Sequence, residues 1–137
     1  MEDPDLNGRC ILLVEDDHIV AKSLARLLDL WGARIVGPAP TVDRALALLR
    51  STKKIDIGLL DVTLRDSTIL PVADALMARG VPFAFTTGSS TSLIPERYRD
   101  VPVLQKPYDA DEIAKVLLPL TVRAAAGGWA PRQAADG

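Results

Sequence analysis

The chain has 137 residues, which is the length of one domain with a short tail. Its composition, 48% hydrophobic and 25% charged residues, is ordinary for a globular protein with a single core. A net charge of -2 lacks the basic excess of proteins that bind nucleic acid or anionic membranes. One cysteine and one histidine exclude an internal disulfide and a zinc site built from these residues.

No targeting or membrane segment is predicted. The first eight residues are acidic and polar, without the basic start and apolar stretch of a signal peptide. No apolar run approaches the ~20 residues that a membrane helix needs. We therefore expect a cytoplasmic protein, and the single cysteine is consistent with a reducing compartment.

Strand and helix patterns alternate along the chain. Apolar segments predict strands at residues 10–14, 34–36, 57–60, 81–85 and 102–105. Apolar residues at helical spacing predict helices over residues 20–31, 42–49, 72–78 and 113–120. A further helix after residue 88 should be short and irregular, because Pro95 would interrupt it.

This alternation predicts an α/β fold, in which a doubly wound parallel sheet carries helices on both faces. Right-handed crossovers then bring the loops that follow the strands to one edge of the sheet. We place the folded domain at residues 9–122, with flexible segments at 1–8 and 123–137.

Reactive residues stand where the predicted strands end. Glu15-Asp16-Asp17 follows the first strand, Asp61 the third, Thr86-Thr87-Gly88 the fourth and Lys106-Pro107 the fifth. In open α/β sheets ligands bind just outside these strand ends. We therefore expect carboxylates, a hydroxyl and an ammonium to converge on one rim.

The carboxylates favour a metal site. Taken alone, the acidic run could be a solvated turn, with Asp17 as the helix cap. Asp61 favours a site, because a lone carboxylate that ends a wholly apolar strand needs partners. Glu15, Asp16 and Asp61 together offer hard oxygen ligands of the kind that Mg²⁺ takes.

The remaining rim residues suit a phosphoryl group. Lys106 is a point-charge phosphate binder, Thr87 adds a hydroxyl donor, and Gly88 leaves space for close approach. Phosphoryl transfer needs mainly positioning and electrostatic stabilisation, and an aspartate such as Asp61 is a competent nucleophile that gives an aspartyl phosphate.

With these motifs in this order, residues 9–120 resemble the receiver domain of two-component response regulators. The matching segments are Val14-Glu15-Asp16-Asp17, Leu60-Asp61-Val62, Thr86-Thr87-Gly88 and Lys106-Pro107-Tyr108. The resemblance implies a flavodoxin-like receiver fold with strand order 2-1-3-4-5. It also implies the site roles: Glu15 and Asp16 as the acidic pair, Asp61 as phosphoacceptor, Thr87 as switch hydroxyl, Lys106 as the paired lysine, and the backbone carbonyl of Thr63 as a further Mg²⁺ ligand.

The resemblance further implies a signalling role. A histidine kinase or histidine phosphotransfer protein would phosphorylate Asp61, the first helix would dock that donor, and the domain would catalyse only its own phosphorylation and dephosphorylation. The last helix and fifth strand would form the face for an output protein or a homodimer. A phosphate sink or shuttle and a receiver module excised from a hybrid kinase remain alternatives. A phosphatase of the haloacid dehalogenase type is disfavoured, since Thr63 stands where such enzymes carry a second aspartate.

Two features set the chain apart from most receivers. Val103 stands where receivers usually carry a switch aromatic. The segments around Thr87 and Lys106 are instead similar to single-domain receivers common in alphaproteobacteria, some of which rearrange a loop. We therefore hypothesise that phosphorylation reorganises residues 89–100.

Expectations also follow for three further residues. Thr63 and Ser89 would flank the path of water to the phosphoryl group, and His18 is expected to be a solvated residue at a helix start.

Overall fold

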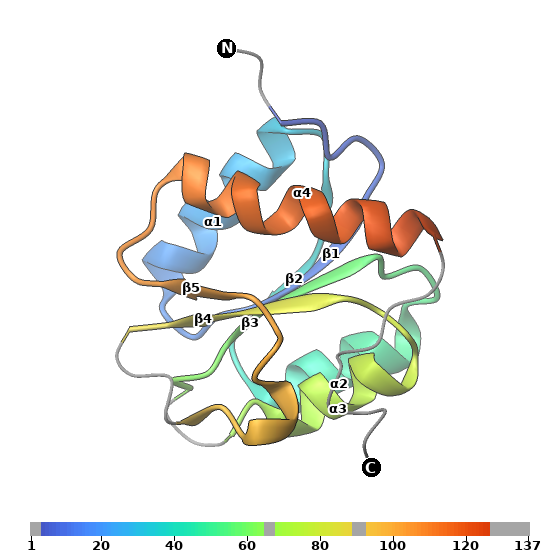
Figure 1. Cartoon of the computed structure of the whole chain (residues 1–137), viewed down its shortest axis with the longest axis vertical. Coiled ribbons are helices and arrows are strands. Elements are labelled where there is room, and N and C mark those ends of the chain that lie inside the picture. Colours follow the sequence, from blue (N-terminus) through green and yellow to red (C-terminus); the bar gives the residue numbers. More distant parts are fainter. Residues whose placement is uncertain (1–3, 65–67, 89–92, 127–137) are drawn as a thin grey trace.

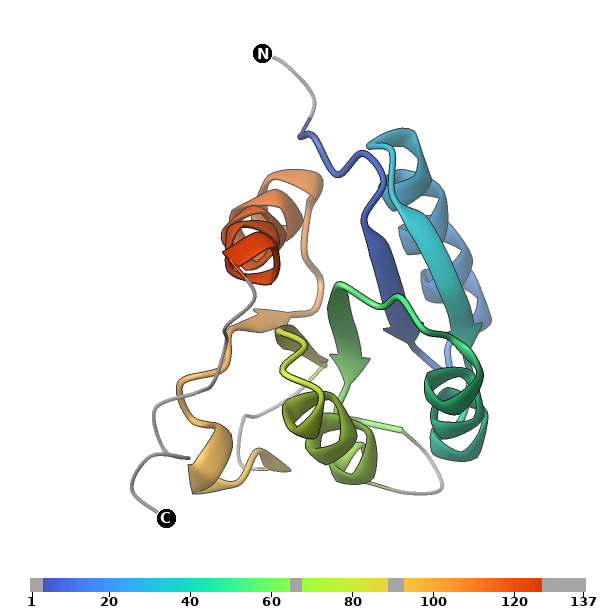
Figure 2. The ribbon, with the colours of Figure 1, turned by 90° about the vertical axis from the view of Figure 1, so that its right-hand side faces the viewer.

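The computed structural model describes residues 4–64, 68–88 and 93–126, which form a five-stranded parallel sheet between two layers of helices (Figure 1; Figure 2). The strands lie in the order β2-β1-β3-β4-β5, so the predicted order 2-1-3-4-5 is confirmed. The strands are β1 Cys10–Val14, β2 Arg34–Ala39, β3 Ile57–Asp61, β4 Phe83–Thr87 and β5 Val103–Gln105.

The helices follow the strands as an α/β fold requires. They are α1 His18–Leu30, α2 Val42–Ser51, α3 Leu70–Ala78 and α4 Ala110–Ala126, with a 3₁₀ helix, η2, at Glu96–Tyr98. Core side chains of α1 and α4 pack against one face of the sheet, while those of α2 and α3 pack against the other. Within the part of the chain that is described, no helix has the length and apolar character to cross a membrane.

Local capping signals fix where the helices begin. The carboxylate of Asp17 accepts hydrogen bonds from the backbone N–H groups of Ile19 and Val20, and the Thr41 hydroxyl accepts one from Arg44. Asp109 and Glu112 bond reciprocally, each side chain accepting from the other's N–H, as a capping box predicts.

Two strands differ by more than one residue from their sequence-based bounds. β2 continues through Gly37 and Pro38 to Ala39, whose carbonyl accepts from the Glu15 N–H at 3.0 Å. Proline is tolerated there because β2 is an edge strand. β4 runs two residues later than predicted, since the Val81 N–H still bonds to the Leu76 carbonyl and closes the turn after α3.

The ends of the domain also differ. Leu6, which we placed in a flexible segment, is fully buried, and its N–H donates to the Trp31 carbonyl at 2.9 Å. Helix α4 continues past residue 122 to Ala126, because the arginine and alanines that follow are strong helix formers. Trp129 and the other residues of 127–137 lie outside the described residues.

The middle strand β3 is buried on both faces along its whole length, and Gly58 lets it pack closely against α3. A Cβ atom at Gly58 would lie 2.6 Å from Leu76 Cδ1 and 3.1 Å from Phe83 Cβ. Burial of this strand places its last residue, Asp61, at the rim of a water-free core.

We predict that Gly58→Ala lowers the free energy of unfolding by about 1–3 kcal/mol, because the added methyl overpacks the β3–α3 contact. Urea unfolding would measure the change. Gly88→Ala is the control, since its Cβ would meet only Lys106 Cδ at 3.9 Å. Equal stability of the two variants would contradict the packing argument.

Candidate functional site

Three carboxylates meet at the carboxyl ends of β1 and β3. Glu15 and Asp61 are 3% and 1% exposed, and Asp16 is half-buried. One oxygen from each lies within 4.8 Å of the others, so the acidic residues predicted from the sequence form one cluster. Parallel pairing of Val14 with Leu60 sets this meeting, because it aligns the two strand ends.

The ammonium of Lys106 joins the two most buried carboxylates. Its Nζ lies 2.8 Å from Glu15 Oε1 and 3.1 Å from Asp61 Oδ2. The side chain reaches the cluster from the end of β5, where the Lys106 N–H donates to the Thr87 carbonyl at 2.7 Å. The predicted pairing of Lys106 with Asp61 is thus present, and it extends to Glu15.

Burial sets the protonation of the cluster. Loss of solvation, together with the nearby Asp61, raises the pKa of Glu15 to about 7, although Lys106 acts in the opposite direction. Burial would raise the pKa of Asp61 too, but hydrogen bonds from Glu15, Thr63 and Lys106 outweigh it and lower that pKa. Burial opposes the charge of Lys106, yet the two carboxylates raise its pKa overall. Asp61 is therefore the carboxylate that stays ionised.

Both oxygens of Asp61 have partners. Oδ2 accepts from Lys106, while Oδ1 accepts from the Thr63 N–H at 2.8 Å and from Thr63 Oγ1 at 2.7 Å. Thr63 thus holds the carboxylate from the side opposite Lys106. Metal binding by its backbone carbonyl stays a prediction, and Ser89 lies outside the described residues.

Thr87 ends β4 beside the cluster and is fully buried. Its neighbour Thr86 is the register partner of Asp61 on β3, and Thr87 itself pairs with Gln105 on β5. Gly88 follows, and a Cβ atom there would meet only Lys106 Cδ, at 3.9 Å. The sheet therefore brings all the residues predicted for phosphoryl chemistry to one rim.

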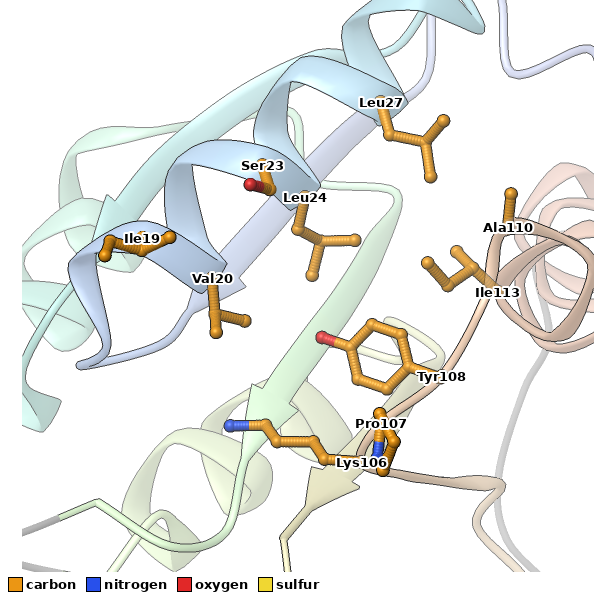
Figure 3. Close-up of a pocket in the computed structure, with 10 residues that line it drawn as sticks. All are labelled: Ile19, Val20, Ser23, Leu24, Leu27, Lys106, Pro107, Tyr108, Ala110 and Ile113. Atoms are coloured by element: carbon orange, nitrogen blue, oxygen red, sulfur yellow. The ribbon is translucent and has the colours of Figure 1, made fainter.

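Sequence reasoning missed an apolar groove that opens beside the rim, between α1 and the start of α4 (Figure 3). It has a volume of about 510 Å³, with Ile19, Leu27 and Tyr108 among its lining residues. Ile19, at the outer edge, is 76% exposed. The sequence signal for this groove was the helical spacing of apolar residues along α1.

The Tyr108 hydroxyl lies at the inner end of this groove. It is buried and, in the described part of the chain, has no hydrogen-bond partner. Burial, and then the charge of Glu15, raise the pKa of this phenol, so it stays protonated. His18, in contrast, is exposed at the start of α1, where a solvated residue was expected.

Comparison with solved structures finds chains of similar sequence and fold, one of which is a response regulator domain. SdrG from Sphingomonas melonis Fr1 is 43% identical, with a TM-score of 0.73 over 82% of this chain and 96% of that one. A structure titled as the BeF3-activated conformation of SdrG, from Pseudomonas melonis Fr1, is also 43% identical, with a TM-score of 0.70 over 85% of this chain and 98% of that one. The Erythrobacter litoralis PhyR response regulator REC domain is 25% identical, with a TM-score of 0.73 over 85% of this chain and 92% of that one.

A curated relative is also similar to this chain in sequence. The phyllosphere-induced regulator PhyR of Methylorubrum extorquens is 31% identical over 116 residues, which are 83% of this chain. The matched region spans 40% of that relative's length. No family model matches the chain.

Glu15 makes stability depend on pH when no metal ion is added. Its pKa is raised in the folded state, so between its ordinary value and about 7 the folded protein holds more protons than the unfolded chain. Its contribution to stability is then greatest below its ordinary pKa and is lost as the pH rises through about 7. The lowered pKa of Asp61 acts at more acidic pH, where protonation removes its contribution.

We predict that the free energy of unfolding in chelator falls between about pH 5 and about pH 8 more steeply for the wild type than for Glu15→Gln. Urea unfolding at each pH would measure it. Asp43→Asn, an exposed change in the first turn of α2, should keep the wild-type slope. Parallel profiles for wild type and Glu15→Gln would contradict the burial of an ionisable Glu15.

Proposed function

The chain belongs to the response regulator receiver family, and from that premise we propose that Asp61 accepts a phosphoryl group from a histidine kinase or a histidine phosphotransfer protein. One observation carries the proposal: the Asp61 carboxylate is 1% exposed and accepts hydrogen bonds from Lys106 on one oxygen and from Thr63 on the other. Burying a charge is costly, so a side chain with a purely structural role at this point would more simply be apolar.

The donor set fits a divalent cation. Glu15, Asp16 and Asp61 supply only carboxylate oxygens, within 4.8 Å of one another, and Mg²⁺ favours one or two carboxylates together with water and phosphate oxygens. When bound, Mg²⁺ would neutralise charge on the phosphoryl oxygens. The ligands we expect are these three carboxylates and the Thr63 carbonyl.

The transfer needs a nucleophile and a positively charged group that stabilises the phosphoryl oxygens. An Asp61 oxygen forms the new O–P bond, the P–N bond of the donor phosphohistidine breaks, and its electron pair returns to the imidazole nitrogen. Lys106 offsets the negative charge that the phosphoryl group brings to the rim. The Thr87 hydroxyl then bonds a phosphoryl oxygen and biases β4 and its following segment toward a second arrangement.

Phosphorylation of Asp61 would change the surface that partner proteins contact. We propose that phosphorylation changes the affinity for an output protein, and that the domain catalyses only its own phosphorylation and dephosphorylation. A phosphate sink or shuttle, and a receiver module within a hybrid kinase, are the alternative settings for the same chemistry. A cytoplasmic location, an output or homodimer face on α4 and β5, and the absence of nucleic acid and membrane partners stay predictions.

We predict that acetyl phosphate with Mg²⁺ gives a single phosphoryl adduct, because Asp61 is the ionised buried nucleophile. Intact-mass spectrometry would detect it. Asp61→Asn should give none, whereas the exposed control Asp43→Asn should behave as the wild type. An adduct that persists in Asp61→Asn, or that forms equally well without a divalent cation, would contradict the assignment.

The groove beside the rim suits a helical phosphodonor. Its apolar lining on α1 reaches the surface at Ile19, and Lys106 lies at its inner end (Figure 3). The ammonium of Lys106 is 3.1 Å from Asp61 Oδ2. An apolar helix seated there would bring a phosphohistidine toward Asp61, and amphipathic helices bind grooves of this kind.

We predict that Ile19→Asp slows phosphotransfer from a phosphorylated histidine phosphotransfer protein by about tenfold or more, because it places a charge at the edge of an apolar contact. Uptake from acetyl phosphate should not change, which separates docking from chemistry. Leu30→Asp is the matched control, since Leu30 is 72% exposed at the far end of the same helix. Equal slowing by both variants would contradict docking in the groove.

A further inference from the structure

Three aromatic rings pack behind the phosphorylation rim. Phe83 and Phe85 from β4 and Tyr98 from η2 meet edge to face, with ring centroids 5.5 to 6.0 Å apart. Tyr98 is only 2% exposed. The segment that follows residue 92 is thus anchored to β4 by a ring that fills the core on the α2–α3 side of the sheet.

Asp74 on α3 fastens Tyr98 in this position. The Tyr98 hydroxyl donates a hydrogen bond to Asp74 Oδ1, and Arg97 Nη2 donates to both carboxylate oxygens at 3.0 and 3.2 Å. The Arg97 guanidinium also lies 4.8 Å from the centre of the Tyr98 ring. We call Asp74, Arg97 and Tyr98 the clasp, because together they tie η2 to α3.

The clasp is connected to Thr87 through β4. Side chains alternate along a strand, so Phe83, Phe85 and Thr87 share one face of the sheet. Phe85 is therefore the neighbour of Thr87 on that face, and its ring contacts Tyr98. The register partner of Phe85 on β5 is Val103, which is too small to take the place of the Tyr98 ring.

We propose that Tyr98, held by Asp74, is a positioning residue for Thr87, and that the clasp opposes the rearrangement that phosphorylation drives. Any shift of the end of β4 toward Asp61 carries Phe85 with it and disturbs the packing of Phe85 on Tyr98. The clasp is closed in this structure, so it stabilises the arrangement of β4 and η2 seen here. This inference rests on the proposed function of Asp61.

The test compares the affinity for beryllofluoride, a phosphoryl mimic, among clasp variants. Tyr98→Phe keeps the ring and removes the hydroxyl, and Asp74→Ala removes its acceptor. Each should tighten the beryllofluoride dissociation constant in Mg²⁺ by about three- to tenfold, as expected when a contact specific to the free state is lost. The double variant should tighten it no more than either single variant, because both break one clasp. Amide NMR titrations would give the constants.

Control measurements separate positioning from plain stability. Glu96→Gln breaks the exposed ion pair between Glu96 of η2 and Arg99, the residue that follows η2, and should leave the dissociation constant unchanged. A merely structural clasp would lower the stability of free and bound protein alike, so its loss would leave the constant within about twofold of the wild type. That result, or weaker binding, would overturn the inference. Failure of the wild type itself to bind beryllofluoride would instead refute the proposed function.

Discussion

The ammonium of Lys106 is the interaction on which the rim depends. Two carboxylates that are almost completely buried end adjacent strands, and their mutual repulsion in a poorly solvated place would be costly without a cation between them. Lys106 supplies that cation from β5, reaching both Glu15 and Asp61. The strand between them, β4, positions this lysine. It lies between β3 and β5, and its Thr87 carbonyl accepts a hydrogen bond from the Lys106 N–H.

Most of the fold could be predicted because its signals are local. Capping residues such as Asp17 and Thr41 act on their own helices, and apolar runs define the strands within two or three residues. The strand order came from the family resemblance instead. The ends of the domain depended on packing that no local pattern carries: Leu6 is buried in a core cluster with Trp31, to whose carbonyl its N–H donates, and β2 passes Pro38 because it is an edge strand.

The site shows the same division. Asp61 and Lys106 could be found because each interrupts an apolar strand, and parallel pairing then forces them together. The hydrogen bonds from Thr63 to Asp61, the contact of Lys106 with Glu15, and the groove at Tyr108 depend on side-chain directions that one-dimensional spacing does not encode. Tyr98 lay within the segment that we expected to reorganise, but its bond to Asp74 could be seen only in three dimensions.

The charge of the cluster explains how Lys106 can contact Glu15 in this structure and would contact a phosphoryl group on Asp61. With all groups ionised, three carboxylates and one ammonium leave the rim negative, and burial together with the nearby Asp61 raises the pKa of Glu15 to about 7. A divalent cation would remove the excess and with it the need for Lys106 to contact Glu15. Under the proposed function, Lys106 is then available to the phosphoryl group that Asp61 receives. The negative charge of the rim therefore favours metal binding, and metal binding would leave Lys106 to stabilise the phosphoryl group during transfer.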